Sequence, residues 1–300
     1  MRVTLIHNPA AGRQGAAQGR KLRKLLKRFG HEVRYHSSKD KGLRRVLKKD
    51  ADLVAVAGGD GTVGKVARRM VGRGVPIAVL PAGTANNVAR SLGVIGRPFE
   101  DLVRGWEEGR HVKLDVGSAT GPWGERYFLE GVGAGLFADL LTRQGGAREQ
   151  RRKKHKANPV EGALRRLKQR AATCEPVEVR ARLDGRDISG RYLMLEAVNL
   201  RYVGPNLHLA HDSQPGDGTF HVVMVTEAER PRLVHYLEHW QDNRERLAML
   251  PSQRGRRLQI EWTGFALHID DKLKPVEDAA ADEVAGLVEA RIAHAVEFVV

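Results

Sequence analysis

Two short apolar runs, each followed at once by a glycine-rich turn, constrain the fold of this chain more than any other feature. The first run covers residues 53–57 and leads into Gly58-Gly59-Asp60-Gly61-Thr62. The second covers residues 75–80 and leads into Pro81-Ala82-Gly83-Thr84-Ala85-Asn86-Asn87. Such short, valine-rich runs are typical of buried parallel strands. Because strands and helical patterns alternate over residues 1–92, the sequence predicts a parallel sheet with helices on both faces.

The turn after the first run is suited to binding a phosphate group. Glycines between a strand and a helix bring bare backbone N–H groups close to a ligand, and the N-terminus of the helix favours negative charge. Asp60 lies inside this turn. A carboxylate beside a phosphate is useful when it holds Mg²⁺ or accepts a proton, since alone it would repel the ligand.

Two better-known phosphate motifs overlap the same residues, and neither fits. Gly59-x-Gly61-x-x-Gly64 has the spacing of the dinucleotide fingerprint, but residues 80–83 (Leu-Pro-Ala-Gly) occupy the place of the acid expected about 20 residues later. Residues 59–65 also have the spacing of a P-loop, but Val66 stands where a Ser or Thr should bind Mg²⁺. Each motif therefore lacks one residue that it requires.

Taken together, GGDGT followed by PxGTxN resembles the diacylglycerol kinase catalytic domain, in the bacterial lipid kinase family that is related to the sphingosine and ceramide kinases. The resemblance implies an ATP-dependent lipid kinase that transfers the γ-phosphoryl group to a lipid hydroxyl, on diacylglycerol or a related glycerolipid or sphingoid. It also implies a doubly wound, NAD kinase-like α/β nucleotide-binding domain, followed by an antiparallel β-sandwich that binds the lipid. We expect these domains at residues 1–110 and 111–290, with a last strand at 291–300 that returns to the first domain.

Beyond residue 110 the pattern itself changes from strand–helix units to short strands. Residues 111–142 predict a hairpin, and helices are expected only at 159–172 and 231–248. This pattern indicates a second domain that is mostly antiparallel β-structure.

The resemblance assigns the nucleotide site to three turns of the first domain and one serine. The expected contacts are Asn8, Pro9, Ala10, Ala11, Gly12, Ser38, Gly58, Gly59, Asp60, Gly61, Thr62, Val63, Gly64 and Thr84. The segment from Asn8 to Gly12 is similar to the family's NPxxG turn, although an ordinary strand-to-helix turn would read the same way. Ser38 best matches a threonine near the nucleotide, by its distance from Gly42.

A loop in the second domain resembles the family's site for a structural Mg²⁺. By register within residues 206–219, the Asp217 side chain and the backbone carbonyls of Gln214 and Thr219 would be the ligands. Oxygen ligands of this kind suit Mg²⁺ or Ca²⁺. A plain Asp-Gly turn is the alternative, and Gly216, where many relatives have a second Asp, leaves fewer charged ligands.

Two further acids, Asp60 and Asp115, are candidates for binding the metal or accepting a proton. Asp60 is the best-placed carboxylate for binding Mg²⁺ or accepting a proton. Asp115, in Lys-Leu-Asp-Val-Gly, matches an aspartate that related kinases keep near the metal. Capping of a strand-end turn is an equally good interpretation of Asp115.

The position of the proton acceptor departs from the family. Relatives carry Asp-Gly-Glu after a strand, and here the matching residues are Asp270, Asp271 and Lys272. A lysine that is protonated at neutral pH cannot accept a proton as the glutamate would. Three interpretations stay open: Asp60, Asp270 or Asp271 is the base, Lys272 clamps a phosphate, or the chain is a weak or inactive nucleotide- and membrane-binding member.

Two smaller departures lie in the nucleotide turns. Asn87 stands where relatives often have Asp, and Gly64 replaces a common Asn. A working enzyme is favoured, because the glycines and threonines expected to contact phosphate are all present. An NAD kinase relative is the less favoured alternative, since the second turn resembles that of the lipid kinases.

The net charge of +15 implies an anionic partner. Aromatic residues make up only 5% and no nucleic-acid motif is recognised, so an anionic membrane is expected and nucleic acid is not. Residues 143–158 carry seven Lys or Arg against Glu149. They predict an exposed basic loop on anionic headgroups, with a plain solvated loop as the alternative.

The chain is expected to be cytoplasmic with peripheral membrane association. No apolar run approaches the ~20 residues that span a bilayer, and the first residues do not resemble a signal peptide. Cys174 is the single cysteine, which excludes an intrachain disulfide.

Overall fold

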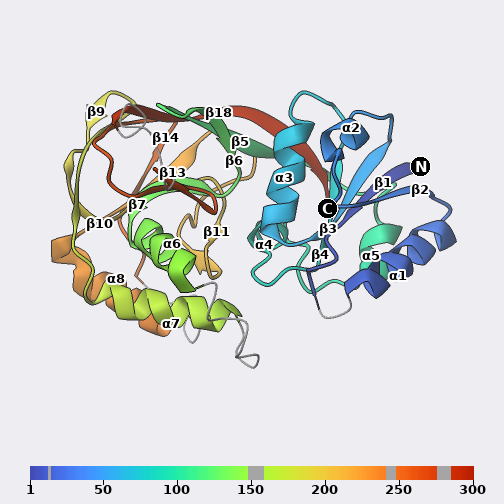
Figure 1. Ribbon diagram of the computed structural model, residues 1–300, viewed down its shortest axis with the longest axis horizontal. Helices are drawn as coiled ribbons and strands as arrows, with labels where there is room; N and C mark the ends of the chain where they lie inside the picture. The colour runs from blue at the N-terminus through green and yellow to red at the C-terminus, as the bar shows by residue number, and fades with distance from the viewer. Residues whose placement is uncertain (13–14, 148–158, 241–247, 276–284) are drawn as a thin grey trace. The chain divides into compact units, whose positions relative to one another are not determined.

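The computed structural model describes residues 1–12, 15–147, 159–240, 248–275 and 285–300 (Figure 1). It has a mixed α/β fold with parallel N-terminal strands and antiparallel C-terminal strands. The chain divides into two compact units. Unit 1 comprises Met1–Val116, Gln214–Asp217 and His294–Val300, and unit 2 comprises Gly117–Ser213 and Gly218–Ala293.

Unit 1 is built on a parallel sheet. Its strands are β1 (Arg2–His7), β2 (Glu32–Ser37), β3 (Leu53–Gly58) and β4 (Ile77–Pro81), with the end of β18 (Gly286–Val299). The spatial order is β18-β4-β3-β1-β2, and β18 joins in parallel through Phe298 opposite Ile77. All six residues of β3 are buried, as its unbroken apolar run predicts.

Helices cover both faces of this sheet. They are α1 (Gly15–Arg28), α2 (Leu43–Leu47), α3 (Asp60–Met70), α4 (Asn87–Ser91) and α5 (Phe99–Arg104). Helices α2 and α3 lie on one face, and α1 and α5 lie on the other (Figure 1). This follows from the strand order, because β2 lies on one side of β1 and β3 lies on the other. Right-handed crossovers then place the helix after β1 on one face and the helices after β2 and β3 on the opposite face. In sheets of this kind, ligands bind outside the carboxyl ends of the strands at the point where the strand order reverses, which here lies between β1 and β3.

Unit 2 is built from antiparallel strands. They are β5 (His111–Gly121, which begins in unit 1), β6 (Gly124–Phe128), β7 (Gly131–Gly135), β8 (Val177–Leu183), β9 (Arg186–Asp187), β10 (Gly190–Val198), β11 (Tyr202–Val203), β12 (Leu207–His208), β13 (Phe220–Thr226), β14 (Ser252–Gly255), β15 (Arg257–Trp262), β16 (Leu267–Ile269) and β17 (Lys272–Lys274). The main path runs β17-β16-β7-β10-β8-β15-β18, and β13 and β14 branch from β10. A core that includes Phe128, Phe220 and Trp262 is buried between these strands.

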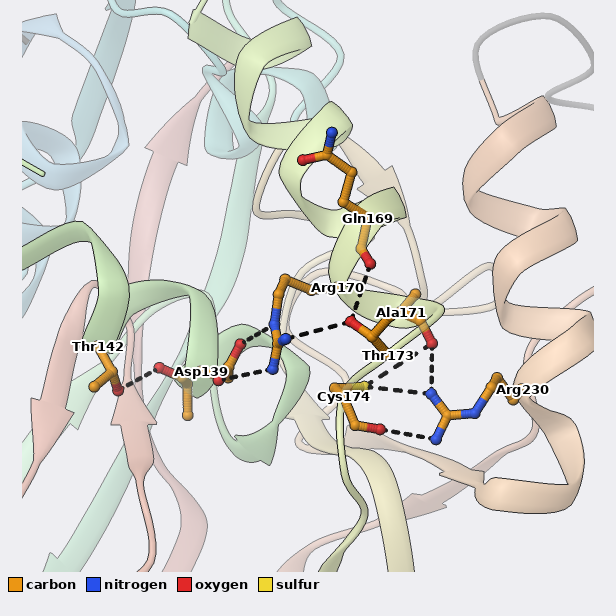
Figure 2. A network of polar contacts seen from close by, with 9 residues as sticks. Asp139, Thr142, Gln169, Arg170, Ala171, Thr173, Cys174 and Arg230 are labelled. Carbon is orange, nitrogen blue, oxygen red and sulfur yellow. Dashed lines mark hydrogen bonds and ion pairs between the residues drawn. The ribbon is translucent and has the colours of Figure 1, made fainter.

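Three helices of unit 2 are tied together by arginines (Figure 2). They are α6 (Leu136–Ala147), α7 (Pro159–Ala171) and α8 (Arg230–His239), the last preceded by a 3₁₀ turn, Glu227–Glu229. Arg170 Nε donates to Asp139 Oδ2 at 2.7 Å and joins α7 to α6. Arg230 donates to the carbonyl oxygens of Ala171 and Cys174, both at 2.8 Å. Since the last carbonyls of a helix lack intrahelical partners, Arg230 at the start of α8 caps the end of α7.

Helix α6 corrects an expectation from the sequence. The segment 111–142 was predicted to be a hairpin and 143–158 a basic loop, but α6 covers Leu136–Ala147. Leu136 and Leu140 are buried, and α6 packs against β7 and β16. This packing outweighs the poor helix propensity of the two glycines near the end of α6. The rest of the expected loop, residues 148–158, lies outside the described residues.

A stack of aromatic rings surrounds His208 in the β11–β12 hairpin. The His208 ring lies 4.7 Å from Tyr202 and 3.7 Å from His211, measured between ring centroids. Burial lowers the pKa of His208 to about 4, and the neighbouring His211 and Arg201 add to this effect. His208 is therefore neutral near pH 7.

We expect His208 to make the fold sensitive to acid. Its pKa in the folded chain is about 4, below the ordinary value of 6.5. As the pH falls from about 6.5 towards 4, His208 therefore binds a proton in the unfolded chain before it does so in the folded chain. The free energy of unfolding decreases across that window. His208→Phe keeps a ring that can stack on Tyr202 but cannot bind a proton. Its free energy of unfolding in urea should therefore decrease less than that of the wild type between pH 7 and pH 4.5. His235→Gln, at an exposed position of α8, serves as control. Equal losses in wild type and His208→Phe would contradict the assignment.

Candidate functional site

Most of the predicted nucleotide residues lie in turns at the carboxyl ends of four adjacent strands of unit 1. Asn8 follows β1, and Ser38 follows β2. Gly58 is the last residue of β3, residues 59–62 lead into α3, and residues 82–86 follow β4. Carboxyl ends of parallel strands meet at one edge of a sheet, and the strand order reverses between β1 and β3 at this edge. Thr84 is exposed in the turn after β4.

Asn8 connects the turn after β1 to the start of α3. Its Nδ2 donates to Thr62 Oγ1 at 3.2 Å, and its Oδ1 accepts a hydrogen bond from the Ala10 N–H at 3.0 Å. Its backbone N–H donates to the Ala57 carbonyl at 2.9 Å. One asparagine thus shapes its own turn and attaches it to the GGDGT turn.

The turns after β3 and β4 contact each other through glycines. A Cβ on Gly59 would lie 2.9 Å from Gly83 Cα, and a Cβ on Gly83 would overlap Gly59 Cα. The Ala82 N–H donates to the Gly58 carbonyl at 3.1 Å and closes the contact. No side chain larger than hydrogen fits at either position without moving backbone.

Asn86 fixes the shape of the second turn. It has a left-handed backbone with φ of 53°, a conformation that asparagine tolerates well. Its Oδ1 accepts from the Gly83 N–H at 2.9 Å, and its Nδ2 donates to the Gly83 carbonyl at 3.0 Å. The asparagine of PxGTxN therefore holds the glycine that faces Gly59.

Asp60 joins the start of α3 to the start of α4. Its Oδ1 accepts a hydrogen bond from the Val88 N–H at 2.9 Å. Burial raises the pKa of Asp60, while backbone N–H groups of Val88, Asn87 and Asn86 act in the opposite direction. A carboxylate at the N-terminus of a helix is stabilising, so Asp60 has a structural contact in addition to any role toward a ligand.

Ser38 is held against α3. Its N–H donates to the His7 carbonyl at 2.7 Å, and its own carbonyl accepts from Lys65 Nζ at 2.7 Å. Lys65 was not singled out from the sequence. Helix α3 is thereby linked to the turns after β1, β2 and β4.

The expected metal loop is split between the two units. Gln214 and Asp217 belong to unit 1, as does Asp115, whereas Thr219 belongs to unit 2. The Gln214 N–H donates to Asp217 Oδ2 at 3.4 Å, and the Asp217 N–H donates to the Gln214 carbonyl at 3.3 Å. Asp115 is buried. In the described part of the chain, no three His, Cys, Asp or Glu side chains gather as potential metal ligands.

The structure explains Gly216 in this loop. Its φ is 76°, and a Cβ there would lie 2.6 Å from the Lys113 carbonyl oxygen. The turn therefore packs closely on β5, two residues from Asp115. An aspartate at position 216 would have to displace the backbone of β5.

The turn that matches the family's proton acceptor lies in unit 2, between β16 and β17. The Asp270 carboxylate accepts backbone N–H groups of Leu129, Glu130 and Gly131, with Oδ1 2.9 Å from the Glu130 nitrogen. Asp271 and Lys272 form an ion pair at 3.1 Å, and both side chains are largely exposed. Asp270 is therefore a fixed structural anion, and Asp271 faces solvent.

A buried ion pair beneath this turn was missed from the sequence. Glu196 on β10 and His268 on β16 both lie opposite Gly133 of β7, and their side chains meet over it with Nε2 2.8 Å from Oε2. His268 Nδ1 lies 2.9 Å from the Asp270 carbonyl oxygen. A Cβ on Gly133 would overlap the Glu196 carboxylate. The sequence feature that could have indicated this pair is the single glutamate in the otherwise apolar run LMLEAV.

The pKa values of this pair move in the same direction. Burial raises the pKa of Glu196. Burial alone would lower the pKa of His268, but the charge and hydrogen bond of Glu196 and the Asp270 carbonyl outweigh it and raise the value. The pair thus retains a proton, and it supports the turn through the contact of His268 with the Asp270 carbonyl.

The glycine contact between the turns predicts opposite outcomes at two glycines. Gly83→Ala should cost about 1–3 kcal/mol of unfolding free energy, the usual cost of overpacking, and should weaken ATP binding by separating the turns. Gly61→Ala has open space, because no atom lies within 4 Å of the added Cβ, and should be neutral or gain up to about 1 kcal/mol in helix α3. Urea unfolding would measure the stability of both variants, and calorimetric titration would measure their affinity for ATP. Equal stability of the two variants would contradict the backbone contact.

Comparison with known proteins identifies similar kinases. Residues 2–119 match the family model "Diacylglycerol kinase catalytic domain". The chain is 27% identical over 240 residues to a diacylglycerol kinase of Bacillus subtilis, covering 76% of this chain and 74% of that protein. It is 24% identical over 288 residues to a diacylglycerol kinase of Mycobacterium tuberculosis, covering 90% and 88%.

The fold is also that of a solved relative. The crystal structure of a diacylglycerol kinase from Bacillus anthracis superimposes with a TM-score of 0.69 at 19% identity, covering 99% of this chain and 96% of that one. The match of the two glycine-rich turns and the family model agree with each other. Residues 2–119 therefore form a domain of the diacylglycerol kinase catalytic domain family of lipid kinases.

Proposed function

We propose that this chain transfers the γ-phosphoryl group of ATP to a lipid hydroxyl, with diacylglycerol or a related glycerolipid or sphingoid as acceptor. One observation carries the proposal: the turns after β1, β3 and β4 are joined through Asn8, Thr62 and the Gly59–Gly83 contact at one edge of the sheet. Membership of a kinase family implies ATP use, and the names of the relatives favour diacylglycerol. Unit 1 is then an NAD kinase-like nucleotide domain, and unit 2 a β-sandwich that binds lipid.

The phosphate groups of ATP fit the start of α3. Phosphoryl transfer depends mainly on positioning and on neutralising charge. Gly61 leaves open space there, and the N-terminus of α3, an 11-residue helix, favours an anion. Asn8, Ser38 and Thr84 would border the nucleotide, as the resemblance implies.

Mg²⁺ fits the chemistry of the available donors, which are all oxygen atoms. Asp217 with the carbonyls of Gln214 and Thr219 would hold one ion, and Asp115 would lie near it. Mg²⁺ that binds together with ATP would supply positive charge against the phosphates. Gly216 leaves a single carboxylate within residues 214–219, so weak retention of the metal is expected.

Asp60 is the best candidate for the proton acceptor. Burial raises its pKa, which strengthens it as a base. The Asp270 carboxylate already accepts three backbone N–H groups, from Leu129, Glu130 and Gly131. Asp271 is exposed and paired with Lys272. We therefore assign Asp60 to the base role and Asp270 to holding the turn.

The alternative function is a nucleotide- and membrane-binding protein with little turnover. Lys272 favours it, because a lysine replaces the family's acceptor glutamate. Lys272 could instead contact a phosphate group of the substrate, since its side chain is 75% exposed. Activity measurements separate these possibilities.

A peripheral contact with an anionic membrane is part of the proposal. Among the described residues, no helix is long and apolar enough to cross a bilayer. Residues 1–116 contain 24 Lys and Arg against 10 Asp and Glu, so unit 1 carries most of the net charge. Basic residues near anionic headgroups contribute about 1 kcal/mol each. The sequence 143–158 adds further positive charge.

The decisive assay is transfer of labelled γ-phosphate from ATP with Mg²⁺ to vesicles that contain diacylglycerol. Asp60→Asn keeps a side-chain oxygen for the Val88 N–H but removes the base, so kcat should fall about 10²–10⁴-fold with ATP binding retained. Asp271→Asn is the control and should keep most activity. Removal of Mg²⁺ by chelation should abolish transfer.

Two results would contradict the proposal. If wild type binds ATP and anionic vesicles but labels no lipid, the binding-protein alternative replaces it. If Asp60→Asn retains full kcat, the base is a different residue, although the kinase assignment would stand.

A further inference from the structure

The guanidinium group of Arg68 lies close to Gly64 in helix α3. A Cβ on Gly64 would be 3.1 Å from Nη1, 3.7 Å from Cζ and 3.8 Å from Nη2 of Arg68. Residues four apart share one face of a helix, and helical side chains lean toward its N-terminus. Arg68 therefore folds back along α3 toward the GGDGT turn, and the absence of a side chain at Gly64 makes room for it.

The face that Arg68 follows leads to the predicted phosphate site. Gly61, Gly64 and Arg68 are spaced i, i+3 and i+7, so they form one stripe along α3. A Cβ on Gly61 would meet no atom within 4 Å. The opposite stripe is apolar and fully buried, as at Val63 and Val66. Lys65 lies beside this stripe, three residues before Arg68, and its Nζ is bound to the Ser38 carbonyl at 2.7 Å. On the stripe itself, Gly64 lies between the half-buried Arg68 and the first turn of α3.

The charge and shape of this group suit a phosphate. Asp60, at the same helix end, would repel a nucleotide, and Asn87 beside it is a neutral amide. A guanidinium stays charged at any relevant pH and presents its N–H donors in a planar fork that matches phosphate oxygens. Arg68 would offset the carboxylate without occupying the open space at Gly61.

The neighbouring Arg69 differs in its surroundings. Its Nη1 donates to the Lys65 carbonyl at 2.8 Å, on a different side of α3. Burial lowers the pKa of Arg69, and the charges of Arg68 and Arg44 add to that. Arg69 therefore offers a matched control of the same residue type, one position along the chain.

We infer that Arg68 binds the terminal phosphoryl groups of the nucleotide from the side of α3. The inference rests on the proposed nucleotide site but not on transfer to a lipid. It adds a binding residue that the resemblance did not assign, and it gives Gly64 a reason: a side chain there would push the guanidinium away.

The test is calorimetric titration of the full chain with ATP, ADP and AMP in Mg²⁺. Arg68→Ala should weaken ATP binding at least tenfold, weaken ADP binding less and leave AMP binding unchanged. Arg68→Lys should fall between wild type and Arg68→Ala, because it keeps the charge but loses the fork. Arg69→Ala should match wild type. Urea unfolding checks that all variants fold.

A double-mutant cycle tests the geometry. Gly64→Ala places a methyl group 3.1 Å from Nη1 and should weaken ATP binding about twofold to fivefold. In the Arg68→Ala background the same change should have no further effect, because the group that it displaces is gone. Additive effects would overturn the role of Gly64.

Unchanged ATP affinity in a folded Arg68→Ala variant would overturn the inference, whether or not wild type phosphorylates lipid. A raised KM for lipid with unchanged ATP affinity would also overturn it, since the guanidinium would then serve the acceptor. If wild type phosphorylates no lipid, but Arg68→Ala loses more affinity for ATP than for ADP and none for AMP, the inference stands and only the transfer reaction fails.

Discussion

Gly59 and Gly83 touch backbone to backbone, and the arrangement of the proposed nucleotide site depends on this contact. It brings the turn after β3 against the turn after β4, so that helices α3 and α4 begin side by side. Asp60 can then reach the Val88 N–H across the two turns. A Cβ at either glycine would separate the strand ends that the site uses, which is why two glycine-rich turns occur as a pair.

Charged side chains that bind backbone groups recur across the molecule. Asp60 accepts an N–H at the start of α4, Asp270 accepts three at residues 129–131, and Arg230 donates to the last carbonyls near α7. Each satisfies polar groups that the ends of helices and strands leave unpaired. The same carboxylates that define the family motif thus also hold the chain in place. Loss of activity in their alanine variants would therefore mix structural and chemical effects, and amide replacements separate the two.

Much of unit 1 could be predicted from the sequence, because its signals are local. An unbroken apolar run followed by glycines predicts a buried parallel strand and a turn, and β3 and β4 follow that pattern. The resemblance to diacylglycerol kinases is confirmed by the family match to residues 2–119. The individual roles of the site residues stay predictions.

The features that were missed depend on contacts between distant segments. Helix α6 has a weak local signal and forms because it packs on β7 and β16. Glu196 and His268 are 72 residues apart and meet only because Gly133 lies between them in the sheet. The place of Arg68 against Gly64 is local in sequence, but side-chain direction at a helix surface is not encoded by the pattern of apolar residues.

Hydrogen exchange of the backbone amides, measured by mass spectrometry with and without ATP and Mg²⁺, tests the central claim most directly. If the turns after β1, β3 and β4 together form the phosphate site, ATP should protect peptides that cover residues 8–12, 58–64 and 82–86, and the protection should diminish in Gly83→Ala. Protection confined to peptides outside these turns would contradict a nucleotide site at the carboxyl edge of the sheet.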